Sequence, residues 1–366
     1  MHIMLVISSL GPGGAERVLS QMANYWQTRG NAITLVTLDS IQSDFYPLNP
    51  GIQRIALGLK KDSEGIFRAL GNNIQRIVSL RNAFRRSAPH VVISFIDTVN
   101  VLTIVAGMGL HIPIIVSERT DPRHHRIGGP WQRLRRILYP KAAAVVVQTP
   151  GVCTWIRNEM PRVNAVNIPN PARTALGGRN DEFVFPIGHN VVAIGRLSRE
   201  KGFDLSIEAF AQCAAEFPAW NLIIFGEGNE RVSLESLVAK HTLGHRIYLP
   251  GLIREPMLVL PTADIFVLSS HFEGFPNALI EAMACGLAAI ATDCPSGPGE
   301  IIQNYSNGIL VPLNNVDELA KAMKALMGDA LLRKTLGQKA SEVKNRFSEE
   351  KVLAKWEDLL DQLTQN

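Results

Sequence analysis

Short apolar runs alternate with longer amphipathic segments along all 366 residues. Several runs are apolar at consecutive positions, which is typical of parallel strands buried on both faces. Strands are predicted at 3–7, 33–38, 91–95, 112–116, 143–147 and 163–168, and again at 191–194, 222–225, 246–249, 265–268, 288–291 and 309–311. Helical patterns lie between most of them, so the sequence predicts an α/β fold with helices on both faces of parallel sheets.

The alternation restarts after Asn170-Pro171, beside a glycine-bearing and charged stretch at 177–182. The chain is too long for one ordinary core and favours two domains. We predict two doubly wound, Rossmann-like domains at 1–170 and 188–347, joined by a linker at 171–187. In such folds ligands bind at the carboxyl ends of the strands, and two in tandem would face a central cleft. The amphipathic segment 348–366 is predicted to be a helix that either crosses back to brace the domains or simply ends the second one.

Composition and cysteine spacing narrow the class of protein. With 46% hydrophobic and 7% aromatic residues, the chain is neither disordered nor of low complexity. Its cysteines form no C-x-x-C pair and no metal-spaced set, which indicates reduced thiols in a reducing compartment rather than zinc ligands or a disulfide scaffold. They are Cys153, Cys213, Cys285 and Cys294. The first apolar run follows no basic segment, so we interpret it as a strand, not a signal peptide.

Charge is distributed unevenly between the two halves. Residues 1–185 hold 21 Lys and Arg against 11 Asp and Glu, a net +10, whereas residues 186–366 carry a net −6. An anionic partner is therefore expected for the first half only, either nucleic acid or an anionic membrane surface. No stretch is apolar enough throughout to span a bilayer.

Glycine-rich loops follow several of the predicted strands. Gly13 and Gly14 stand where the first strand gives way to a helix, and free N–H groups at a helix start can bind phosphate. A tight turn without a ligand explains that loop equally well. In the second half, Arg196 and Lys201 flank a strand end and a helix start, a pairing suited to a diphosphate. Gly226 and Gly228 form a third loop of this kind.

The segment 273–286 is the sharpest local feature. Its first residues are Glu273, Gly274, Phe275, Pro276 and Asn277, and Pro276 and Gly286 are expected to bracket a short helix. Between Ala278 and Cys285 the single polar side chain is Glu281, which is costly to bury without hydrogen-bond donors. Sugar or ribose hydroxyls would supply them. A structural carboxylate satisfied by backbone or by an arginine is the alternative.

These motifs in this order resemble the retaining GT-B glycosyltransferases of family GT4. Its E-x7-E pattern is matched by Glu273 and Glu281, and the likeness spans nearly the whole chain. The other matching pieces are Gly13-Gly14-Ala15-Glu16, Gly195-Arg196, Lys201-Gly202, Gly226-Glu227-Gly228 and Asn307-Gly308-Ile309-Leu310-Val311. The segment 294–302, which contains Glu300, looks like members that transfer N-acetylhexosamines onto lipid-linked oligosaccharides.

The resemblance implies a donor site in the second domain and an acceptor site in the first. It implies that Arg196 and Lys201 hold the donor diphosphate, that Glu273 touches sugar hydroxyls and that Glu281 binds the nucleotide ribose. Phe275, Pro276, Asn277 and Glu300 accompany them on the donor side, together with the glycines of the three loops. No Asp-x-Asp is placed like a metal site, and cationic side chains can stabilise a leaving diphosphate. We therefore expect no metal cofactor, as the resemblance also implies.

The sequence departs from the family after the predicted strand 112–116. Many members carry a histidine there that contacts the donor sugar, whereas this chain has Ser117-Glu118-Arg119-Thr120-Asp121. Glu118 or Asp121 could take part of that place, and Glu118 is our candidate beside Glu273 for a catalytic role. No general base is assigned, and His124 and His125 are expected on a polar loop.

A basic segment runs from Arg119 to Lys141, with six arginines and one acid, Asp121. Trp131, Leu134, Ile137 and Leu138 are predicted to share one helical face, which is typical of membrane-surface binding. Packing of that face into the core is the alternative. The candidate membrane or acceptor residues are Arg119, Arg123, Trp131, Arg133, Arg135 and Arg136, with Arg81, Arg85 and Arg86 adding to the basic face. No stacking aromatics accompany the charge, so nucleic acid is disfavoured.

The leading hypothesis is a retaining glycosyltransferase that moves N-acetylgalactosamine or N-acetylglucosamine from a UDP-sugar to a lipid-linked or other glycan. It would work at the cytoplasmic face of the membrane. A GT-B phosphorylase, a UDP-sugar epimerase and a non-enzymatic nucleotide-sugar-binding protein are the alternatives. Phosphate-dependent cleavage, isomerisation of free UDP-sugar, or binding without turnover would distinguish these three.

Overall fold

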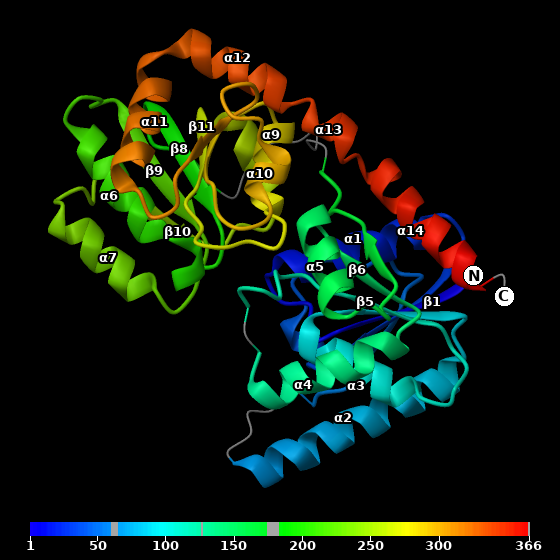
Figure 1. Ribbon diagram of the computed structural model, residues 1–366. Helices are drawn as coiled ribbons and strands as arrows, with labels where there is room; N and C mark the ends of the chain where they lie inside the picture. The colour runs from blue at the N-terminus through cyan, green and yellow to red at the C-terminus, as the bar shows by residue number, and fades with distance from the viewer. Residues whose placement is uncertain (60–64, 126, 174–182, 365–366) are drawn as a thin grey trace. The chain divides into compact units, whose positions relative to one another are not determined.

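The computed structural model describes residues 1–59, 65–125, 127–173 and 183–364. The chain divides into two compact units (Figure 1). Unit 1 comprises residues 1–170 and 352–366, and unit 2 comprises residues 171–351. Most of the expected linker, residues 174–182, lies outside the described residues.

Unit 1 contains a parallel sheet with seven strands among its described residues, in the order β3-β2-β1-β4-β5-β6-β7. The strands are β1 (His2–Ile7), β2 (Ala32–Thr37), β3 (Gln53–Ala56), β4 (Val91–Phe95), β5 (Ile114–Ser117), β6 (Ala144–Val147) and β7 (Ala165–Asn167). The helices are α1 (Gly14–Thr28), α2 (Ile66–Ser87), α3 (Asp97–Gly107), α4 (Gly129–Leu138) and α5 (Pro150–Glu159). Short 3-10 turns lie at η1 (Ile41–Ser43) and η2 (Tyr139–Lys141). Side chains of α1 cover one face of the sheet, and those of α2, α3 and α5 cover the other.

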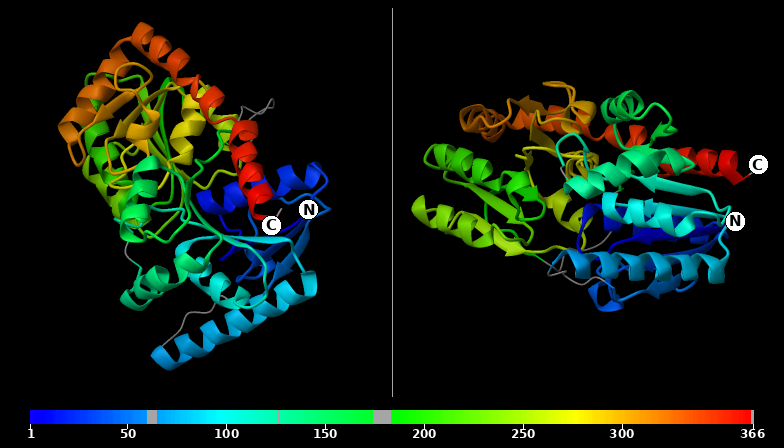
Figure 2. Two further views of the ribbon diagram at one scale, coloured as in Figure 1. Left: turned by 45° about the vertical axis from the view of Figure 1, so that its right-hand side comes forward. Right: turned by 60° about the horizontal axis from the view of Figure 1, so that its bottom comes forward.

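Unit 2 contains a parallel sheet with six strands among its described residues, in the order β10-β9-β8-β11-β12-β13. The strands are β8 (His189–Ile194), β9 (Trp220–Phe225), β10 (Ile247–Gly251), β11 (Ile265–Leu268), β12 (Ala288–Thr292) and β13 (Ile309–Val311). The helices are α6 (Phe203–Ala214), α7 (Arg231–Lys240), α8 (Pro256–Val259), α9 (Asn277–Ala284), α10 (Pro298–Ile301), α11 (Val316–Gly328), α12 (Ala330–Ala340) and α13 (Val343–Arg346). The 3-10 turns are η3 (Arg199–Lys201) and η4 (Leu260–Thr262). α6, α7 and α11 cover one face, and α8, α9 and α13 the other. The predicted fold of two parallel-sheet, Rossmann-like units is thus confirmed (Figure 2).

The last helix, α14 (Glu349–Thr364), crosses back into unit 1. Its buried apolar side chains join the core on the α1 face of the sheet. The Trp356 ring meets the Trp26 ring edge-on at 6.5 Å between centroids and stacks on Phe95 at 6.4 Å. The amphipathic pattern of 348–363 therefore serves to bury one side of α14 in the first unit, which is the crossing-back alternative.

Two local features differ from the sequence-based expectation. The prediction omits β3, because Gln53–Ala56 is a partly exposed edge strand without a continuous apolar run. Pro276 is the residue before the first turn of α9 rather than inside it, while Gly286 follows the helix with a positive φ of 83°, as expected. Among the described residues, no helix has both the length and the apolar character needed to cross a bilayer.

Candidate active site

The predicted donor residues of unit 2 gather at one edge of its sheet. Arg196 and Lys201 follow β8, Gly226 and Gly228 follow β9, and Glu273 follows β11. The segment that contains Glu300 follows β12. Because β9, β8, β11 and β12 are consecutive neighbours in a parallel sheet, their carboxyl ends meet at the same edge. The sheet therefore assembles residues from four separate stretches of sequence.

Lys201 and Glu273 are in direct contact. The Lys201 Nζ donates to Glu273 Oε1 at 2.6 Å, and Ser270 Oγ donates to the same oxygen at 2.7 Å. The Glu273 side chain is buried, whereas Lys201 keeps 24% of its side chain exposed. A buried carboxylate with two donors on one oxygen is held in a fixed position. The second oxygen of Glu273 receives no hydrogen bond from either residue and can accept from a hydroxyl.

The surface around Arg196 is electrostatically positive. Arg196 and Arg199 are both exposed, and Lys201 is half-buried. Burial opposes ionisation of Glu200, but a hydrogen bond from Ser198 and the charges of Arg196 and Lys201 hold the pKa of Glu200 below its ordinary value. The charges of Arg196 and Lys201 thus contribute to keeping Glu200 ionised, after the hydrogen bonds that it accepts.

Glu281 lies inside α9 and is 2% exposed. Burial raises the pKa of the Cys285 thiol, one turn further along, to about 12, and the Glu281 carboxylate contributes to that rise. Likewise, burial and then the charge of Glu273 raise the pKa of Cys294 to about 12. Both thiols are therefore protonated and unreactive at neutral pH.

Gly226 and Gly228 allow two loops to approach closely. A Cβ on Gly226, whose φ is 149°, would lie 1.8 Å from the Gly195 carbonyl oxygen, and one on Gly228 would lie 2.2 Å from that of Leu197. The glycines thus hold the loop after β9 against the loop that carries Arg196. Their first effect is to position that loop, which sequence reasoning had interpreted only as room for a ligand.

The loop after β12 packs on the loop that carries Glu273. The Ser296 hydroxyl donates to the Glu273 carbonyl oxygen at 2.8 Å, and a Cβ on Gly297 would lie 2.7 Å from Pro276 Cδ. Phe275 and Pro276 are buried, and Asn277 begins α9. The half-buried Glu300 lies in the short helix α10 that follows. The predicted donor segments 273–277 and 294–300 therefore form one packed structure.

In unit 1, Gly13 and Gly14 lie at the start of α1, where expected. A Cβ on Gly13 would lie 2.1 Å from Glu16 Oε2, so the Glu16 carboxylate folds back over the helix start. Arg119 follows β5 and interacts electrostatically with the same carboxylate. Burial lowers the pKa of Arg119 to about 9, and the negative charge of Glu16 opposes that fall. The Arg119 guanidinium stacks on the Phe95 ring at 4.1 Å and donates to Asn170 Oδ1 at 2.6 Å. Arg119 is thus held by contacts within unit 1, and its membrane or acceptor role stays a prediction.

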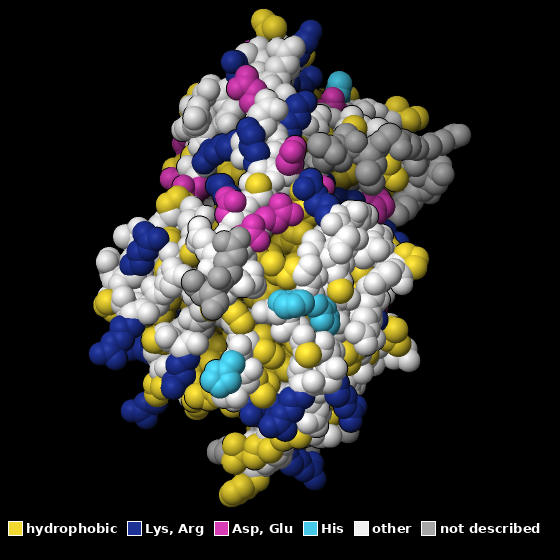
Figure 3. All heavy atoms as spheres, turned by 90° about the vertical axis from the view of Figure 1, so that its right-hand side faces the viewer, with side chains coloured by type: hydrophobic (Ala, Val, Ile, Leu, Met, Phe, Trp, Pro, Cys, Tyr) yellow, Lys and Arg dark blue, Asp and Glu magenta, His cyan; other side chains and the backbone are white. Residues whose placement is uncertain are grey.

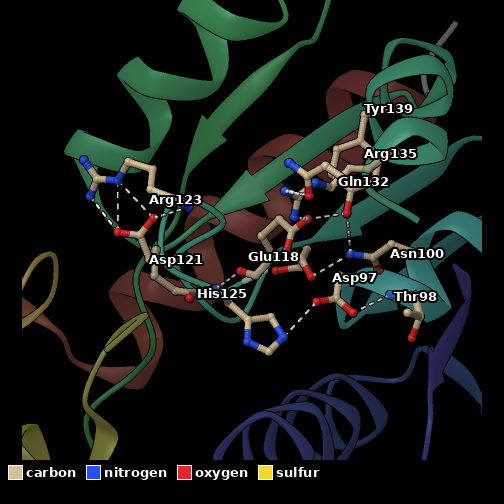
Figure 4. A network of polar contacts seen from close by, with 12 residues as sticks. Asp97, Thr98, Asn100, Glu118, Asp121, Arg123, His125, Gln132, Arg135 and Tyr139 are labelled. Carbon is tan, nitrogen blue, oxygen red and sulfur yellow. Dashed lines mark hydrogen bonds and ion pairs between the residues drawn. The ribbon is translucent and has the colours of Figure 1, made fainter. Parts of the chain in front are cut away.

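Glu118 is 1% exposed and lies in a buried polar network (Figure 4). Tyr139 donates its hydroxyl to Glu118 Oε1, and Arg135 Nη1 lies 3.4 Å from the same oxygen. Asn100 Nδ2 donates to the Tyr139 hydroxyl at 3.3 Å. Burial raises the pKa of Glu118, and the Arg135 charge counteracts it. The network joins the end of β5 to α3, α4 and η2, which gives Glu118 a structural environment rather than an open catalytic one.

The helix α4 does not present the face that its sequence pattern predicts. Arg135 is 2% exposed, and Leu138 is buried beside it. Trp131 packs on the core, whereas Leu134 and Ile137 are exposed. Burial of Arg135 follows from its pairing with Glu118 and from a 2.7 Å hydrogen bond to Gln132.

The other predicted basic residues of this segment keep exposed side chains. Arg133 is exposed, and Arg136 pairs at the surface with Glu159 at 3.2 Å. Arg123 forms a two-pronged contact with the buried Asp121, with distances of 2.7 to 3.0 Å.

Sequence reasoning missed the contact between His125 and Asp97. His125 Nε2 lies 3.3 Å from Asp97 Oδ2, and Figure 4 shows the ring turned toward that carboxylate. Asp97 is buried at the start of α3, directly after β4. The hydrogen bond to Asp97 raises the pKa of His125 despite its partial burial. A histidine therefore does stand near the carboxyl ends of β4 and β5, and no spacing rule in the sequence links positions 97 and 125.

A cavity of about 650 Å³ lies elsewhere in unit 1, under the C-terminal half of α2. Its lining includes His2, Gln53, Asn82 and Arg86, of which Arg86 belongs to the predicted basic face, and none of the predicted donor-site residues. Among the described residues, no group of three or more His, Cys, Asp or Glu is placed to hold a metal ion.

Both halves of the chain match glycosyltransferase families. Residues 12–176 match the model of Glycosyltransferase Family 4, and residues 188–343 match that of Glycosyl transferases group 1. Together the two matches leave only the ends and a short central segment uncovered.

Curated relatives agree with these matches. A Campylobacter jejuni enzyme, the GalNAc-α-(1→4)-GalNAc-α-(1→3)-diNAcBac-PP-undecaprenol α-1,4-N-acetyl-D-galactosaminyltransferase, is 26% identical over 365 residues that cover 98% of each chain. A second galactosaminyltransferase of that organism, which acts on N-acetylgalactosamine-N,N'-diacetylbacillosaminyl-diphospho-undecaprenol, is 26% identical and covers 95% of this chain and 96% of its own. An exopolysaccharide phosphotransferase of Streptomyces coelicolor is 34% identical over 229 residues, but the match spans only 24% of that protein.

Solved structures share the fold across almost the whole chain. Sucrose-phosphate synthase of Thermosynechococcus elongatus has a TM-score of 0.81 at 20% identity, covering 99% of each chain. HepE of Anabaena in complex with UDP and glucose has a TM-score of 0.78 at 18% identity, covering 99% of this chain and 100% of its own. With both halves matched and the fold shared end to end, the chain belongs to the GT-B glycosyltransferases of the family 4 type and is a hexosyltransferase.

Proposed function

We propose that this enzyme transfers an N-acetylhexosamine from a UDP-sugar to a lipid-linked or other glycan, with retention at the anomeric carbon. The observation that carries the proposal is the contact between Lys201 and Glu273 at the carboxyl edge of the unit 2 sheet. It joins a cation suited to phosphate to a carboxylate suited to sugar hydroxyls. The two Campylobacter relatives, which act on diphospho-undecaprenol-linked glycans, support the acceptor class. The UDP and glucose bound to HepE support the donor class.

Unit 2 is the proposed donor-binding domain, with Arg196 and Lys201 on the diphosphate. The Lys201 ammonium has three N–H donors, so it can contact a phosphate oxygen while it holds Glu273. As the bond from sugar to diphosphate breaks, negative charge grows on the leaving UDP. Two cations fixed beside it stabilise that charge more in the transition state than in the bound substrate, which is how they lower the barrier.

In this proposal the two glutamates bind different parts of the donor. Glu273, held by Lys201 and Ser270, presents its remaining oxygen to a sugar hydroxyl. Glu281 accepts from the ribose hydroxyls. Phe275, Pro276, Asn277 and Glu300 belong to the donor side in this proposal, and Gly13 and Gly14 at the start of α1 stay donor-binding candidates.

Unit 1 is the proposed acceptor-binding domain and works at an anionic membrane surface. With α14 included, it holds 20 Lys and Arg against 12 Asp and Glu, a net +8, whereas unit 2 holds 17 against 21, a net −4. A positive domain is attracted to anionic lipid, where a polyprenyl-linked glycan would lie. Glu118 keeps no catalytic role in this proposal because of its burial.

The test is a transfer assay with the purified chain, UDP-GalNAc or UDP-GlcNAc, and a glycan linked to polyprenyl diphosphate. We expect release of UDP together with a product one sugar longer, and an anomeric configuration at the new linkage equal to that of the donor. Isomerisation of the UDP-sugar without acceptor, phosphate-dependent cleavage of the glycan, or tight UDP-sugar binding with no turnover on any glycan would refute it.

A further inference from the structure

The cavity under the C-terminal half of α2 has no part in the proposed transfer. Its volume of about 650 Å³ lies within the range of about 300–1,000 Å³ that is usual for small-molecule sites. The start of β1, the edge strand β3 and α2 supply its walls, together with Leu57 just after β3. None of the predicted donor-site residues lines it, so a ligand bound here would occupy a second site.

One face of α2 supplies a polar wall. Ser79, Asn82 and Arg86 follow one another at intervals of three and four residues, so they share that face of the helix. Leu80 and Phe84, which are buried in the core, hold the helix in place. Among the described residues Arg86 has no hydrogen-bond or ion-pair partner, and its side chain is exposed. The wall thus offers a hydroxyl, an amide and a guanidinium to a ligand.

A chain of hydrogen-bonded side chains forms the wall on the strands. His2 Nε2 lies 2.9 Å from Thr34 Oγ1, which in turn donates to Gln53 Oε1 at 3.0 Å. Thr34 is 1% exposed, so the chain is anchored inside the sheet. Because Gln53 accepts through its oxygen, its NH2 group is the part of the amide that can bind a ligand. Arg76 Nε also donates to the Leu59 carbonyl oxygen at 3.0 Å, which ties α2 to the segment after β3.

The lining suits a ligand that is both anionic and rich in hydroxyls. Among the described residues that line the cavity, Arg86 is the single Lys or Arg and no Asp or Glu accompanies it. A guanidinium binds phosphate through two parallel hydrogen bonds, and amides and hydroxyls bind sugar hydroxyls. Ile55 and Leu57 add apolar surface for the C–H groups of a sugar ring. A phosphate ion alone would leave most of the volume unfilled, and a nucleobase would meet no Phe, Tyr or Trp ring in this lining.

The surroundings of the cavity favour an anion as well. Every charged residue of α2 is an arginine. Figure 3 faces the side of the molecule on which the N-terminus lies in Figure 1. The lower part of that view, at the level of α2, shows Lys, Arg and His side chains and no Asp or Glu. Positive potential of this kind raises the local concentration of an anionic ligand.

We propose that this cavity of unit 1 binds a hexose phosphate, with Arg86 on the phosphate and with Asn82 and Gln53 on the sugar hydroxyls. The inference goes beyond the proposed function, because it assigns a second ligand to a site that the transfer does not use. A ligand that binds the folded unit and not the unfolded chain also stabilises that unit.

The experiment titrates glucose 6-phosphate into the full chain by calorimetry, with and without UDP, and uses inorganic phosphate and glucose as matched probes. Arg86→Gln should weaken binding of glucose 6-phosphate about tenfold or more, because it removes the charge-assisted contact. Arg85→Gln is the control, since Arg85 is exposed beside Arg86 and does not line the cavity. Asn82→Ala should weaken binding by about threefold to tenfold through loss of a neutral hydrogen bond.

Urea unfolding keeps the comparison independent of folding defects. All three variants should unfold like the wild type without ligand, because positions 82, 85 and 86 are exposed, and glucose 6-phosphate should raise the midpoint of the wild type and of Arg85→Gln more than that of Arg86→Gln.

Three results would overturn the proposal. The first is binding of glucose 6-phosphate no tighter than that of inorganic phosphate or glucose. The second is an equal loss in Arg86→Gln and Arg85→Gln, which would reduce the effect to general surface charge. The third is competition by UDP, which would place the sugar phosphate in the donor site. Failure of the wild type to bind UDP would count against the proposed function alone, so the two failures are distinguishable.

Discussion

Lys201 and Glu273 are 72 positions apart in the sequence, yet in the folded chain Lys201 Nζ lies 2.6 Å from Glu273 Oε1. Their contact, with Ser270 on the same carboxylate oxygen, is the residue-scale feature from which the proposed chemistry follows. It also makes the roles of individual side chains separable, because cation, sugar-facing carboxylate and ribose-facing carboxylate are different residues.

Arg196→Ala and Lys201→Ala should each weaken UDP binding and lower turnover by about tenfold to a hundredfold, because each removes a charge-assisted contact of about 1.5–3 kcal/mol. Arg199→Ala is the matched control, since Arg199 is exposed in the same loop and has no proposed phosphate contact. Calorimetric titration with UDP measures the difference. Wild-type affinity in Arg196→Ala would remove Arg196 from the diphosphate site.

The two glutamates should respond differently to loss of charge. Glu281→Gln should weaken binding of both UDP and UDP-sugar, because the ribose is common to them. Glu273→Gln should leave UDP binding nearly unchanged and lower kcat, because its proposed partner is the transferred sugar. Equal UDP affinity in the two variants would contradict the ribose role of Glu281.

His125 should titrate above its ordinary pKa of about 6.5. The hydrogen bond to Asp97 raises that pKa, the charges of Asp97 and Glu118 add to the rise, and partial burial and Arg135 oppose it. A raised folded-state pKa means that the pair stabilises the protein below pH of about 6.5, and that this contribution is lost as pH rises through the folded-state pKa. Asp97→Asn should lower the His125 pKa, followed by NMR of the ring protons. An unchanged His125 titration in Asp97→Asn would show that Asp97 does not hold the ring.

At the scale of elements, α14 shows how a distant segment completes a core. Trp356 is buried against Trp26 and Phe95, so unit 1 lacks part of one covering layer without the last helix. β3 shows the opposite case, an element that pairs with one neighbour only and buries little.

Trp356→Ala should therefore destabilise unit 1 by about 3–5 kcal/mol, the usual cost of deleting a buried aromatic side chain. Lys355→Ala, at an exposed position of the same helix, should change stability little. Urea unfolding followed by far-UV circular dichroism, with UDP binding as a separate report on unit 2, measures this. Equal unfolding midpoints for the two variants would mean that α14 does not contribute to the core.

At the scale of the whole molecule, two units of opposite net charge divide the proposed work, donor binding in unit 2 and membrane docking in unit 1. In this proposal two side chains of unit 2, Arg196 and Lys201, carry the positive charge that stabilises the leaving diphosphate. We therefore expect transfer to persist in EDTA, with UDP release as the readout. Loss of transfer in EDTA that manganese or magnesium restores would assign that charge to a metal ion instead.

The sequence by itself determined the parallel α/β architecture, because strands buried on both faces must be apolar at consecutive positions, and that is a local pattern. It also indicated Arg196, Lys201, Glu273 and Glu281 as candidate donor-site residues. The order of motifs along the chain can be recognised without knowing which residues are in contact. It missed β3, which as a polar edge strand has no such pattern.

Only the tertiary structure decided which side of each helix is buried. Arg135 lies inside because a buried Glu118 from another element stabilises its charge, whereas the apolar Leu134 and Ile137 of the same helix are exposed. The contact of His125 with Asp97 and the return of α14 to unit 1 are likewise long-range facts. The pattern of a helical segment shows how amphipathic the helix is. Which side is buried depends on the elements that pack against it, and the sequence of the segment does not identify them.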